Sequence, residues 1–217
     1  MKKKIQLPTL KLESSFWKEH LLVAGVDEAG RGCLAGPVVA GAVIINDRKL
    51  ARAGIRDSKE LTHESRLEIF EAIKEKSFAY STGIVDNKEI DRINILQASM
   101  KAMRMAIHKL DPLPGQLLID GNYFIDFGIP YRTIIKGDSG CLSIAAASIT
   151  AKVSRDLWMI EKAHKEFPDY GFKAHKGYAT RMHVEAIRQY GTCSLHRLSF
   201  LSKYNNGDRT LFDDDTE

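Results

Sequence analysis

The sequence has little cysteine and no long apolar segment, which excludes several classes of protein. Its 217 residues include only three cysteines, at positions 33, 141 and 193, and none of them forms a Cys-x-x-Cys pair. A disulfide framework and a zinc site are therefore not expected, and a reducing cytoplasm is the expected location. The longest apolar run, 38–45, is far too short to span a bilayer, and no apolar segment follows the N-terminal lysines as in a secretory signal.

The overall composition is typical of one well-packed domain. Hydrophobic residues make up 44% of the chain and charged residues 28%, which does not fit a disordered chain. The net charge is +4 and the pI is near 8.9. If carboxylates gather in one site, the remaining surface must be more basic, and this favours a polyanionic partner without establishing one.

The apolar periodicity predicts an α/β domain. Strands are expected at about 20–27, 37–46, 78–85, 117–119 and 131–135. Helices are expected after a cap at Ser58 or Thr62 and over about 93–110, 142–165 and 180–190. The first strands follow one another and the later ones alternate with helices, so the sheet should be mixed and antiparallel at its start. The small residues at 143–148 predict a helix that packs very close to this sheet.

We divide the chain into three parts. Residues 1–18 form an N-terminal arm without clear periodicity, which Phe16 and Trp17 are expected to pin to the body. Residues 19–166 form the core, and residues 167–217 form a helical C-terminal segment and tail packed on it. The acidic residues at 213–215 are expected to lie in a frayed, solvated end.

The most informative stretch is 23–32, where an apolar run leads into two carboxylates and a glycine-containing turn. Neighbouring side chains on a strand point to opposite faces, so Asp27 and Glu28 should share a pocket only where the strand ends or bulges. Gly30 and Gly32 permit that break and let a ligand approach the backbone closely. For this stretch alone, an ordinary hairpin with a solvated acidic turn is the alternative.

Carboxylates recur where other strands give way to turns. Asp120 follows the run 117–119, and Asp138 follows the run 131–135. Adjacent strand ends lie about 5 Å apart, so these acids could converge with the first pair. Crowded carboxylates stay ionised together only among cations, and oxygen ligands without His or Cys favour Mg²⁺ or Mn²⁺. Two such ions about 3.5–4 Å apart carry out phosphodiester hydrolysis. Coincidental surface acids and a non-catalytic cation site are the alternatives.

An ordered series of motifs over about 20–200 resembles bacterial ribonuclease HII. The matching segments are 25–32, 57–62, 120–122, 136–138, 148–156, 175–178 and 196–200. The resemblance implies a ribonuclease H-like fold with a mixed five-stranded sheet flanked by helices. It implies an endonuclease that hydrolyses the RNA strand of RNA–DNA hybrids and cuts 5′ to single ribonucleotides embedded in duplex DNA. Two Mn²⁺ or Mg²⁺ ions would support catalysis, leaving 3′-hydroxyl and 5′-phosphate ends, with a role in DNA replication and repair.

The resemblance also implies residue roles. The catalytic and metal-binding acids would be Asp27, Glu28, Asp120 and Asp138. The turn Gly30-Arg31-Gly32 would read the ribose 2′-hydroxyl, the group that distinguishes RNA from DNA, through its backbone. Tyr178 would pack on the sugar of the following deoxynucleotide and sense the RNA–DNA junction. Cys33 stands where the family often has proline, which could alter the rigidity of the turn; a small buried residue is expected there.

Other polar residues support weaker interpretations. Lys59 and Lys176 are interpreted as phosphate contacts, with exposed solubilising lysines as the alternative. Asp156 is expected to be a surface acid rather than a support of the site. The pair 196–197 is expected to tie down the C-terminal segment rather than to do chemistry. Surface positions are expected for His63, His164 and His183.

Three other functions fit parts of the sequence. The ribonuclease HIII type carries a sizeable N-terminal substrate-binding domain, but only about twenty residues precede the first expected strand here. A non-catalytic nucleic-acid-binding module of the same fold would be favoured by the loss of an acid, yet all four are present. A nucleotide-binding phosphate loop would need a glycine-rich pattern at a strand–helix junction, and none occurs. We expect a monomer that binds nucleic acid and no membrane.

Overall fold

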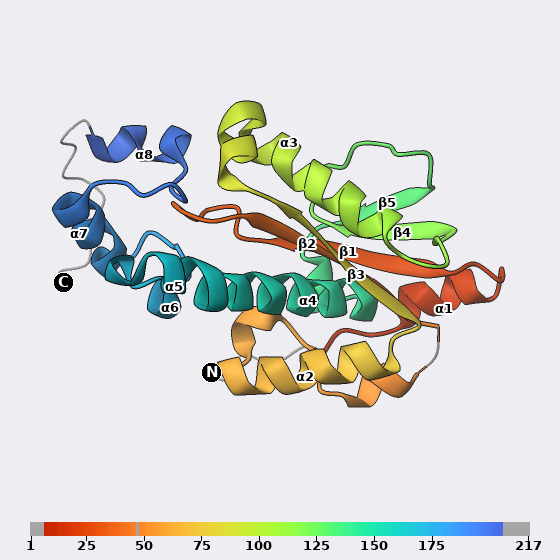
Figure 1. Cartoon of the computed structure of the whole chain (residues 1–217). Helices are drawn as coiled ribbons and strands as arrows, with labels where there is room; N and C mark the ends of the chain where they lie inside the picture. The colour runs from red at the N-terminus through yellow and green to blue at the C-terminus, as the bar shows by residue number, and fades with distance from the viewer. Residues whose placement is uncertain (1–6, 47, 206–217) are drawn as a thin grey trace, which may run out of the picture.

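One mixed sheet forms the centre of the molecule. The computed structural model describes residues 7–46 and 48–205 (Figure 1). Its strands are β1 (Val23–Ala29), β2 (Val38–Ile44), β3 (Ala79–Val85), β4 (Gln116–Asp120) and β5 (Tyr131–Ile134). They lie in the order β3-β2-β1-β4-β5. β1, β2 and β3 are antiparallel neighbours, whereas β4 and β5 run parallel to β1. The predicted mixed sheet of five strands, antiparallel at its start, is confirmed.

Helices cover both faces of this sheet. Before the middle of the chain they are α1 (Lys11–Trp17), α2 (His63–Lys76) and α3 (Asn87–His108). After β5 they are α4 (Leu142–Trp158), α5 (His164–Glu166), α6 (Phe172–His175), α7 (Arg181–Tyr190) and α8 (Leu198–Asn205). α3 lies on one face, and α4 lies on the other with α2 packed against it (Figure 1). Across the two described ranges, no helix is both long and apolar enough to cross a membrane.

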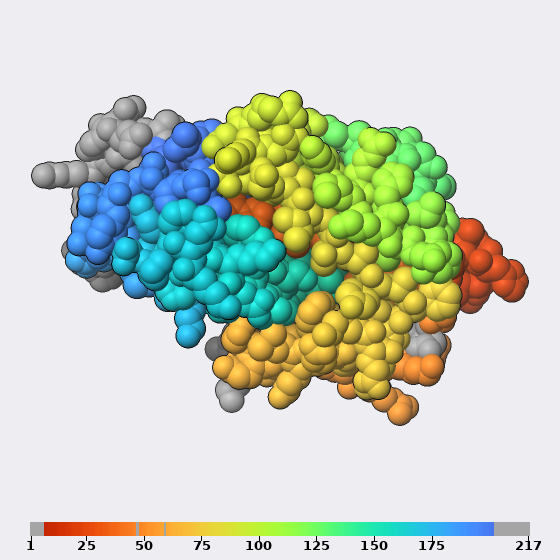
Figure 2. All heavy atoms as spheres, viewed as in Figure 1, coloured from red at the N-terminus to blue at the C-terminus, as the bar shows by residue number. Residues whose placement is uncertain are grey.

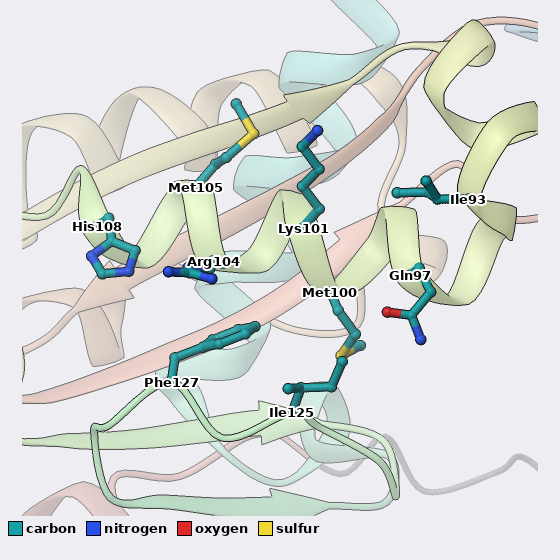
Figure 3. Close-up of a pocket in the computed structure, with 9 residues that line it drawn as sticks. All are labelled: Ile93, Gln97, Met100, Lys101, Arg104, Met105, His108, Ile125 and Phe127. Carbon is teal, nitrogen blue, oxygen red and sulfur yellow. The ribbon is translucent and has the colours of Figure 1, made fainter.

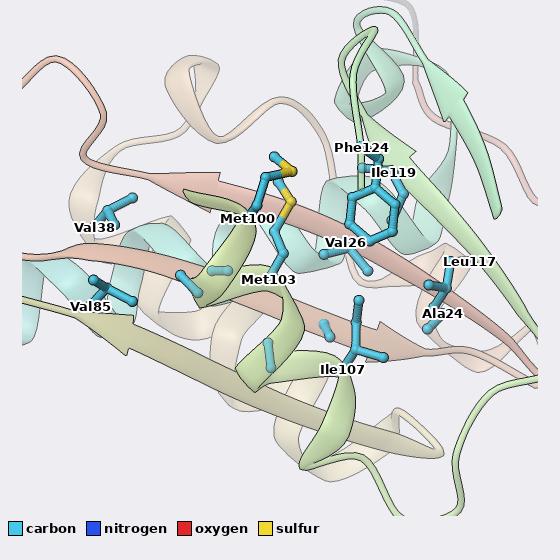
Figure 4. Packing of buried hydrophobic residues seen from close by; sticks show 14 of the residues in the cluster. Ala24, Val26, Val38, Val85, Met100, Met103, Ile107, Leu117, Ile119 and Phe124 are labelled. Carbon is cyan, nitrogen blue, oxygen red and sulfur yellow. The ribbon is translucent and has the colours of Figure 1, made fainter. Parts of the chain in front are cut away.

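The core between α3 and the sheet is built from the periodic apolar residues of that helix. Met100, Met103 and Ile107 point from α3 toward Val26 of β1 and Phe124 after β4 (Figure 4). Met103 and Ile107 are each 1% exposed. The two methionines therefore fill space in the hydrophobic core.

On the opposite face, α4 lies in direct backbone contact with the sheet. A Cβ built on Gly25 of β1 would lie 2.1 Å from the carbonyl carbon of Ser143, and one on Gly41 of β2 would lie 2.4 Å from the carbonyl oxygen of Ala147. Only glycine allows this approach, and the small residues at 143–148 complete it, so the predicted close packing is confirmed. This close packing fixes the positions of the later residues of α4 relative to the end of β1.

Two segments differ from the sequence prediction. The arm contains α1, whose Trp17 indole donates to the carbonyl oxygen of Ile45 at 3.1 Å. Glu13 of this helix is fully buried and accepts from the Ser143 N–H at 2.8 Å, which periodicity could not indicate in a helix of 7 residues. α3 begins at Asn87 rather than near 93, and Asn94, with φ of 67°, interrupts it where the predicted helix starts. The acidic end at 213–215 lies outside the described residues.

Candidate active site

A pocket of about 290 Å³ opens at the end of β1. The structure brings together in it all four predicted acids, part of the glycine turn and the predicted tyrosine. Its lining consists of Asp27, Glu28, Ala29, Gly30, Arg31, Ser58, Arg66, Asp120, Asp138, Ser148, Lys152 and Tyr178. The segments that meet here come from positions more than 100 residues apart in the sequence, so the fold builds the pocket.

The first acidic pair lies within β1 rather than after it. β1 pairs with β2 as far as Ala29 but with β4 only as far as Val26. At Asp27 and Glu28 the strand has therefore lost its parallel neighbour, and the Glu28 N–H donates to Asp27 Oδ1 at 2.7 Å. The expectation that the strand must end or bulge at this pair is wrong, because both residues line the pocket while pairing with β2 continues.

The other two acids come from the neighbouring parallel strands. Asp120 is the last residue of β4, and its Oδ1 accepts from the Gly137 N–H at 2.7 Å. Asp138 lies in a short 3₁₀ turn, Gly137–Ser139, which follows β5 and is entered through Lys136 at φ 56°. This hydrogen bond joins the two segments and brings both carboxylates to the same pocket.

Without a bound cation, three of the acids, Asp27, Glu28 and Asp120, disfavour one another's ionised forms. Burial, followed by the Glu28 and Asp120 carboxylates, raises the pKa of Asp27 well above its usual range, although the Ser148 hydroxyl opposes this. Burial also raises the pKa of Glu28, against the effect of the Arg31 guanidinium 3.1 Å from its Oε1. Such a set of oxygen donors fits a hard divalent cation, which would relieve the repulsion. As the side chains of the described residues stand, no three of His, Cys, Asp or Glu are arranged to hold a metal ion.

The two glycines of the turn have different environments. Gly30 has φ of 93°, and a Cβ there would lie 2.0 Å from Arg155 Nε. Arg155 is fully buried and donates to the carbonyl oxygens of Pro37 at 2.8 Å, Ala35 at 3.1 Å and Lys176 at 2.9 Å. A Cβ at Gly32 would meet no atom of the described residues within 4 Å, so the backbone there faces open space beside them. Glycine at position 30 is thus required by the packing of Arg155, whereas the backbone at Gly32 leaves room for a ligand.

Tyr178 presents a neutral ring to the pocket. The side chain is 38% exposed, and burial, with Cys33 next in effect, raises its pKa to about 12. Two cations lie over the ring: Lys152 Nζ is 4.9 Å and Arg155 Cζ is 5.6 Å from its centroid. Because the phenol stays protonated at neutral pH, Tyr178 offers an uncharged ring for packing and is not suited to act as a base. Cys33 beside it is buried, as expected.

The two lysines interpreted as phosphate contacts are placed differently. Lys176 does not line the pocket, and its Nζ donates to the backbone carbonyls of Lys173 and Ala174. Burial lowers the pKa of Lys176. The side chain of Lys59 lies outside the described part of the chain. Their role as phosphate contacts stays a prediction.

Several residues in the pocket wall and directly behind it were not found by sequence reasoning. Asp156 is 4% exposed, so the interpretation as a surface acid is wrong. Its Oδ1 accepts from Lys152 Nζ at 2.8 Å, and its Oδ2 lies 3.9 Å from Arg66. Ser148, Lys152 and Asp156 recur at four-residue spacing in α4, a helix whose buried residues are mostly small or apolar. That spacing is the signal that could have found them, because residues four apart share one helix face.

The C-terminal segment holds the glycine turn in place. Arg197, fully buried, donates to the carbonyl oxygens of Gly36 at 3.0 Å and Arg31 at 2.9 Å. The predicted tie at 196–197 is confirmed. The same segment lies beside the start of α3 (Figure 2), where the Ser199 N–H donates to Asp91 at 3.0 Å.

Three buried histidines support the tyrosine loop. His183 is fully buried, so the expected surface position is wrong. Of the other two histidines expected at the surface, His63 is exposed and His164 is partly buried. Nδ1 of His183 hydrogen-bonds to the carbonyl oxygen of Tyr178 at 2.9 Å, and its Nε2 lies 3.2 Å from Nε2 of His196. The ring of His175 stacks on His183 with centroids 4.3 Å apart. The loop that carries Tyr178 therefore rests on a packed aromatic base.

A larger hollow, about 750 Å³, lies between α3 and the connection after β4 (Figure 3). None of the four acids contributes to it, and its floor is apolar. Its lining consists of Ile93, Gln97, Met100, Lys101, Arg104, Met105, His108, Ile125 and Phe127. By volume alone, this hollow would be the candidate active site. The carboxylates are in the smaller pocket, which is therefore the better candidate.

Comparisons with known proteins agree with the motifs. The family model described as Ribonuclease HII matches residues 24–203. The ribonuclease HII of Acetivibrio thermocellus is 47% identical over 192 residues, 88% of this chain and 74% of that protein. The ribonuclease HII of Caldicellulosiruptor bescii is 51% identical over 182 residues, 84% of this chain and 87% of that protein. The solved ribonuclease H2 of Pyrococcus horikoshii is 29% identical with a TM-score of 0.68, covering 82% of this chain and 93% of that chain.

Proposed function

The chain belongs to the ribonuclease HII family, nucleases that act on RNA–DNA hybrids, and from this premise we propose that it also cuts 5′ to single ribonucleotides embedded in duplex DNA. The products would carry 3′-hydroxyl and 5′-phosphate ends. The single observation that supports this most is the meeting of four carboxylates and a neutral tyrosine ring in one pocket, which Gly30 and Arg31 of the glycine turn also line.

The four acids are proposed to hold divalent cations. Asp27, Glu28, Asp120 and Asp138 offer only oxygen donors, which suits Mg²⁺ or Mn²⁺. Two ions, when bound, would lower the pKa of the attacking water and stabilise the leaving oxygen. The raised pKa of Asp27 supports this, because burial and the neighbouring carboxylates disfavour its ionised form and a bound cation would offset both effects.

The glycine turn is proposed to recognise the ribose. Gly32 faces open space, so a sugar could come close to the backbone around it and its 2′-hydroxyl could hydrogen-bond there. Arg155 and Arg197 hold this turn through the carbonyls of Ala35 and Arg31, so the reading surface is preformed. Arg31, whose side chain is 52% exposed, stays paired with Glu28 at the edge of the pocket.

Tyr178 is proposed to pack on the sugar of the next, deoxy, nucleotide. Its ring is partly exposed in the same pocket as the acids, so one substrate could contact both. A deoxyribose lacks the 2′-hydroxyl and leaves room for the ring. The ring would therefore distinguish a deoxynucleotide from a ribonucleotide at this position and so recognise the RNA–DNA junction. Lys59 and Lys176 are proposed to contact phosphates. The C-terminal segment from residue 167, described as far as residue 205, is proposed to pack on the core of a monomer.

The proposal is tested with a labelled duplex that carries one ribonucleotide, incubated with Mg²⁺, Mn²⁺ or EDTA, and with an all-DNA duplex as control. Cutting 5′ to the ribonucleotide only with a metal, and none of the all-DNA duplex, is expected. Asp120→Asn should abolish cutting while the protein stays folded. A folded protein that binds the duplex without cutting it would instead be a binding module of the same fold.

A further inference from the structure

α4 carries a row of polar residues along the wall of the pocket. Ser148, Lys152 and Asp156 lie four residues apart, and the first two line the pocket with the acids. Asp156 lies one step further back, is 4% exposed and does not line the pocket. A buried carboxylate at this place requires partners, and two cations that line the pocket lie beside it.

The first partner connects Asp156 to the tyrosine. Lys152 Nζ donates to Asp156 Oδ1 at 2.8 Å and at the same time lies 4.9 Å from the centroid of the Tyr178 ring. A lysine stem is flexible, and its ammonium adopts one position only where a partner fixes it. Asp156 is that partner, so it sets where the cation meets the ring.

Arg155, the second cation over the ring, is held independently. It donates to three backbone carbonyls, and no ion pair with Asp156 is found among the described residues. The Tyr178 ring therefore rests on one permanently fixed cation and on one that depends on Asp156. Loss of Asp156 should loosen the ring without releasing it completely.

The other partner connects Asp156 to the opposite wall of the pocket. Arg66 lies 3.9 Å from Asp156 Oδ2 and donates to the carbonyl oxygens of Ser58, at 2.8 and 3.0 Å, and Leu61, at 2.9 Å. The Ser58 hydroxyl in turn lies 3.3 Å from that of Ser148. One buried carboxylate thus braces both the tyrosine and the turn at 58–61.

We propose that Asp156 is a positioning residue that, through Lys152, fixes the Tyr178 ring and so contributes to the selectivity for a ribonucleotide followed by DNA. This inference rests on the proposed role of Tyr178 as the sensor of the junction. Asp156 contacts none of the four acids in any hydrogen bond found among the described residues, so its loss should leave the hydrolytic chemistry in place. The loss of activity should appear with the duplex that carries a single ribonucleotide, because its cleavage is proposed to depend on the Tyr178 ring.

The test compares kcat/KM of Asp156→Asn for two substrates: a duplex with one ribonucleotide and a long RNA–DNA hybrid. Asn keeps the shape of the side chain and removes its charge. We expect kcat/KM for the single ribonucleotide to fall by about tenfold, in line with the effect of a small misplacement, and that for the hybrid to change by less than about threefold. Lys152→Met should shift the ratio of the two values in the same direction.

The chain offers matched controls away from the pocket. Lys74 Nζ lies 2.6 Å from Glu71 and 5.3 Å from the centroid of the Phe70 ring, which reproduces the acid–lysine–aromatic arrangement outside the site. Glu71→Gln and Lys74→Met change the charge as the test variants do and should leave the ratio unchanged. Thermal unfolding of all four variants separates lost selectivity from lost stability, and Lys152→Met keeps the test decisive if Asp156→Asn does not fold.

A double-mutant cycle separates positioning from a general structural effect. In a Tyr178→Ala background, Asp156→Asn should cause no further change in the ratio, because the ring through which it acts is absent. An equal loss on both substrates, or the same additional loss with and without Tyr178, would overturn the inference. If the wild-type protein cuts the hybrid but not the single-ribonucleotide duplex, the proposed function itself fails; an unchanged ratio in Asp156→Asn with an active wild type removes this inference alone.

Discussion

Arg155 occupies the space in which a side chain at Gly30 would lie. A Cβ on Gly30 would come within 2.0 Å of Arg155 Nε, and the guanidinium cannot retreat because three backbone carbonyls hold it. Arg155 thus shapes the turn at Gly30, although more than 120 residues separate the two in the sequence. The same arginine lies against Tyr178. One buried cation therefore contacts both the turn proposed to recognise the ribose and the tyrosine proposed to sense the junction.

The two glycines of the turn should respond differently to alanine. Gly30→Ala meets Arg155 and must adopt a φ near 93°, so we expect it to lower the free energy of unfolding by about 2 kcal/mol or more. Gly32→Ala meets no atom within 4 Å and should fold with near-normal stability while losing about tenfold or more in kcat/KM for a ribonucleotide substrate. Urea unfolding and steady-state kinetics of both variants provide the measurement. Normal activity in Gly32→Ala would remove this glycine from recognition of the sugar.

Removal of an acid should stabilise the metal-free protein. The pKa of Asp27 is raised, so the folded state disfavours its ionised form, and stability decreases as the pH rises through that pKa. Asp27→Asn should therefore unfold at a higher temperature than wild type in EDTA at pH 8, with the difference shrinking as the pH falls toward 4. Activity should drop by about a hundredfold or more. Lower stability of Asp27→Asn at pH 8 without metal would contradict the cost of burying this carboxylate beside Glu28 and Asp120.

Acid should destabilise the protein through the buried histidines. Burial lowers the pKa of His183 to about 3, and burial also lowers the pKa of His175 and of His196. The facing Nε2 atoms of His183 and His196, 3.2 Å apart, accommodate a single proton between them. Each such group contributes stability above pH 6.5 that is lost as the pH falls, at up to about 1.4 kcal/mol per pH unit.

This pH dependence is measured by urea unfolding between pH 7.5 and 4.5. The exposed His63 provides the control, and His63→Gln should leave the slope unchanged. His183→Gln should be less stable at pH 7 but show a shallower slope below pH 6.5. Identical slopes in wild type and His183→Gln would show that this histidine does not carry the acid sensitivity.

The ring of Tyr178 should matter and its hydroxyl should not. Because its pKa is about 12, the phenol stays neutral over the working range. Tyr178→Phe should keep kcat/KM for a single ribonucleotide within about threefold, whereas Tyr178→Ala should lose about tenfold or more. A loss as large in Tyr178→Phe as in Tyr178→Ala would point to the hydroxyl instead of the packing.

The sequence was sufficient for those parts of the fold that follow from local periodicity and spacing. The strands, the long α4 and the meeting of the acids could be predicted because each acid stands next to a recognisable apolar run and a glycine. The burial of Asp156 could have been suspected from its four-residue spacing to Lys152, but its second partner, Arg66, lies far away in the sequence. The burial of His183 could not be predicted, because its contact with His196 depends on how the segment after α7 folds back. The different roles of Gly30 and Gly32 depend on Arg155 in the same way. Helix α1 was missed because its 7 residues cover too few turns for a period to show.

The most direct test of the account is cleavage of a duplex containing one ribonucleotide by wild type and by Asp120→Asn, with and without Mn²⁺ or Mg²⁺. We predict a single cut 5′ to the ribonucleotide, made only by the wild type and only with metal, and no cut in an all-DNA duplex. Cleavage by Asp120→Asn at the wild-type rate, or wild-type cleavage that persists in EDTA, would contradict catalysis by metal ions held among these four acids.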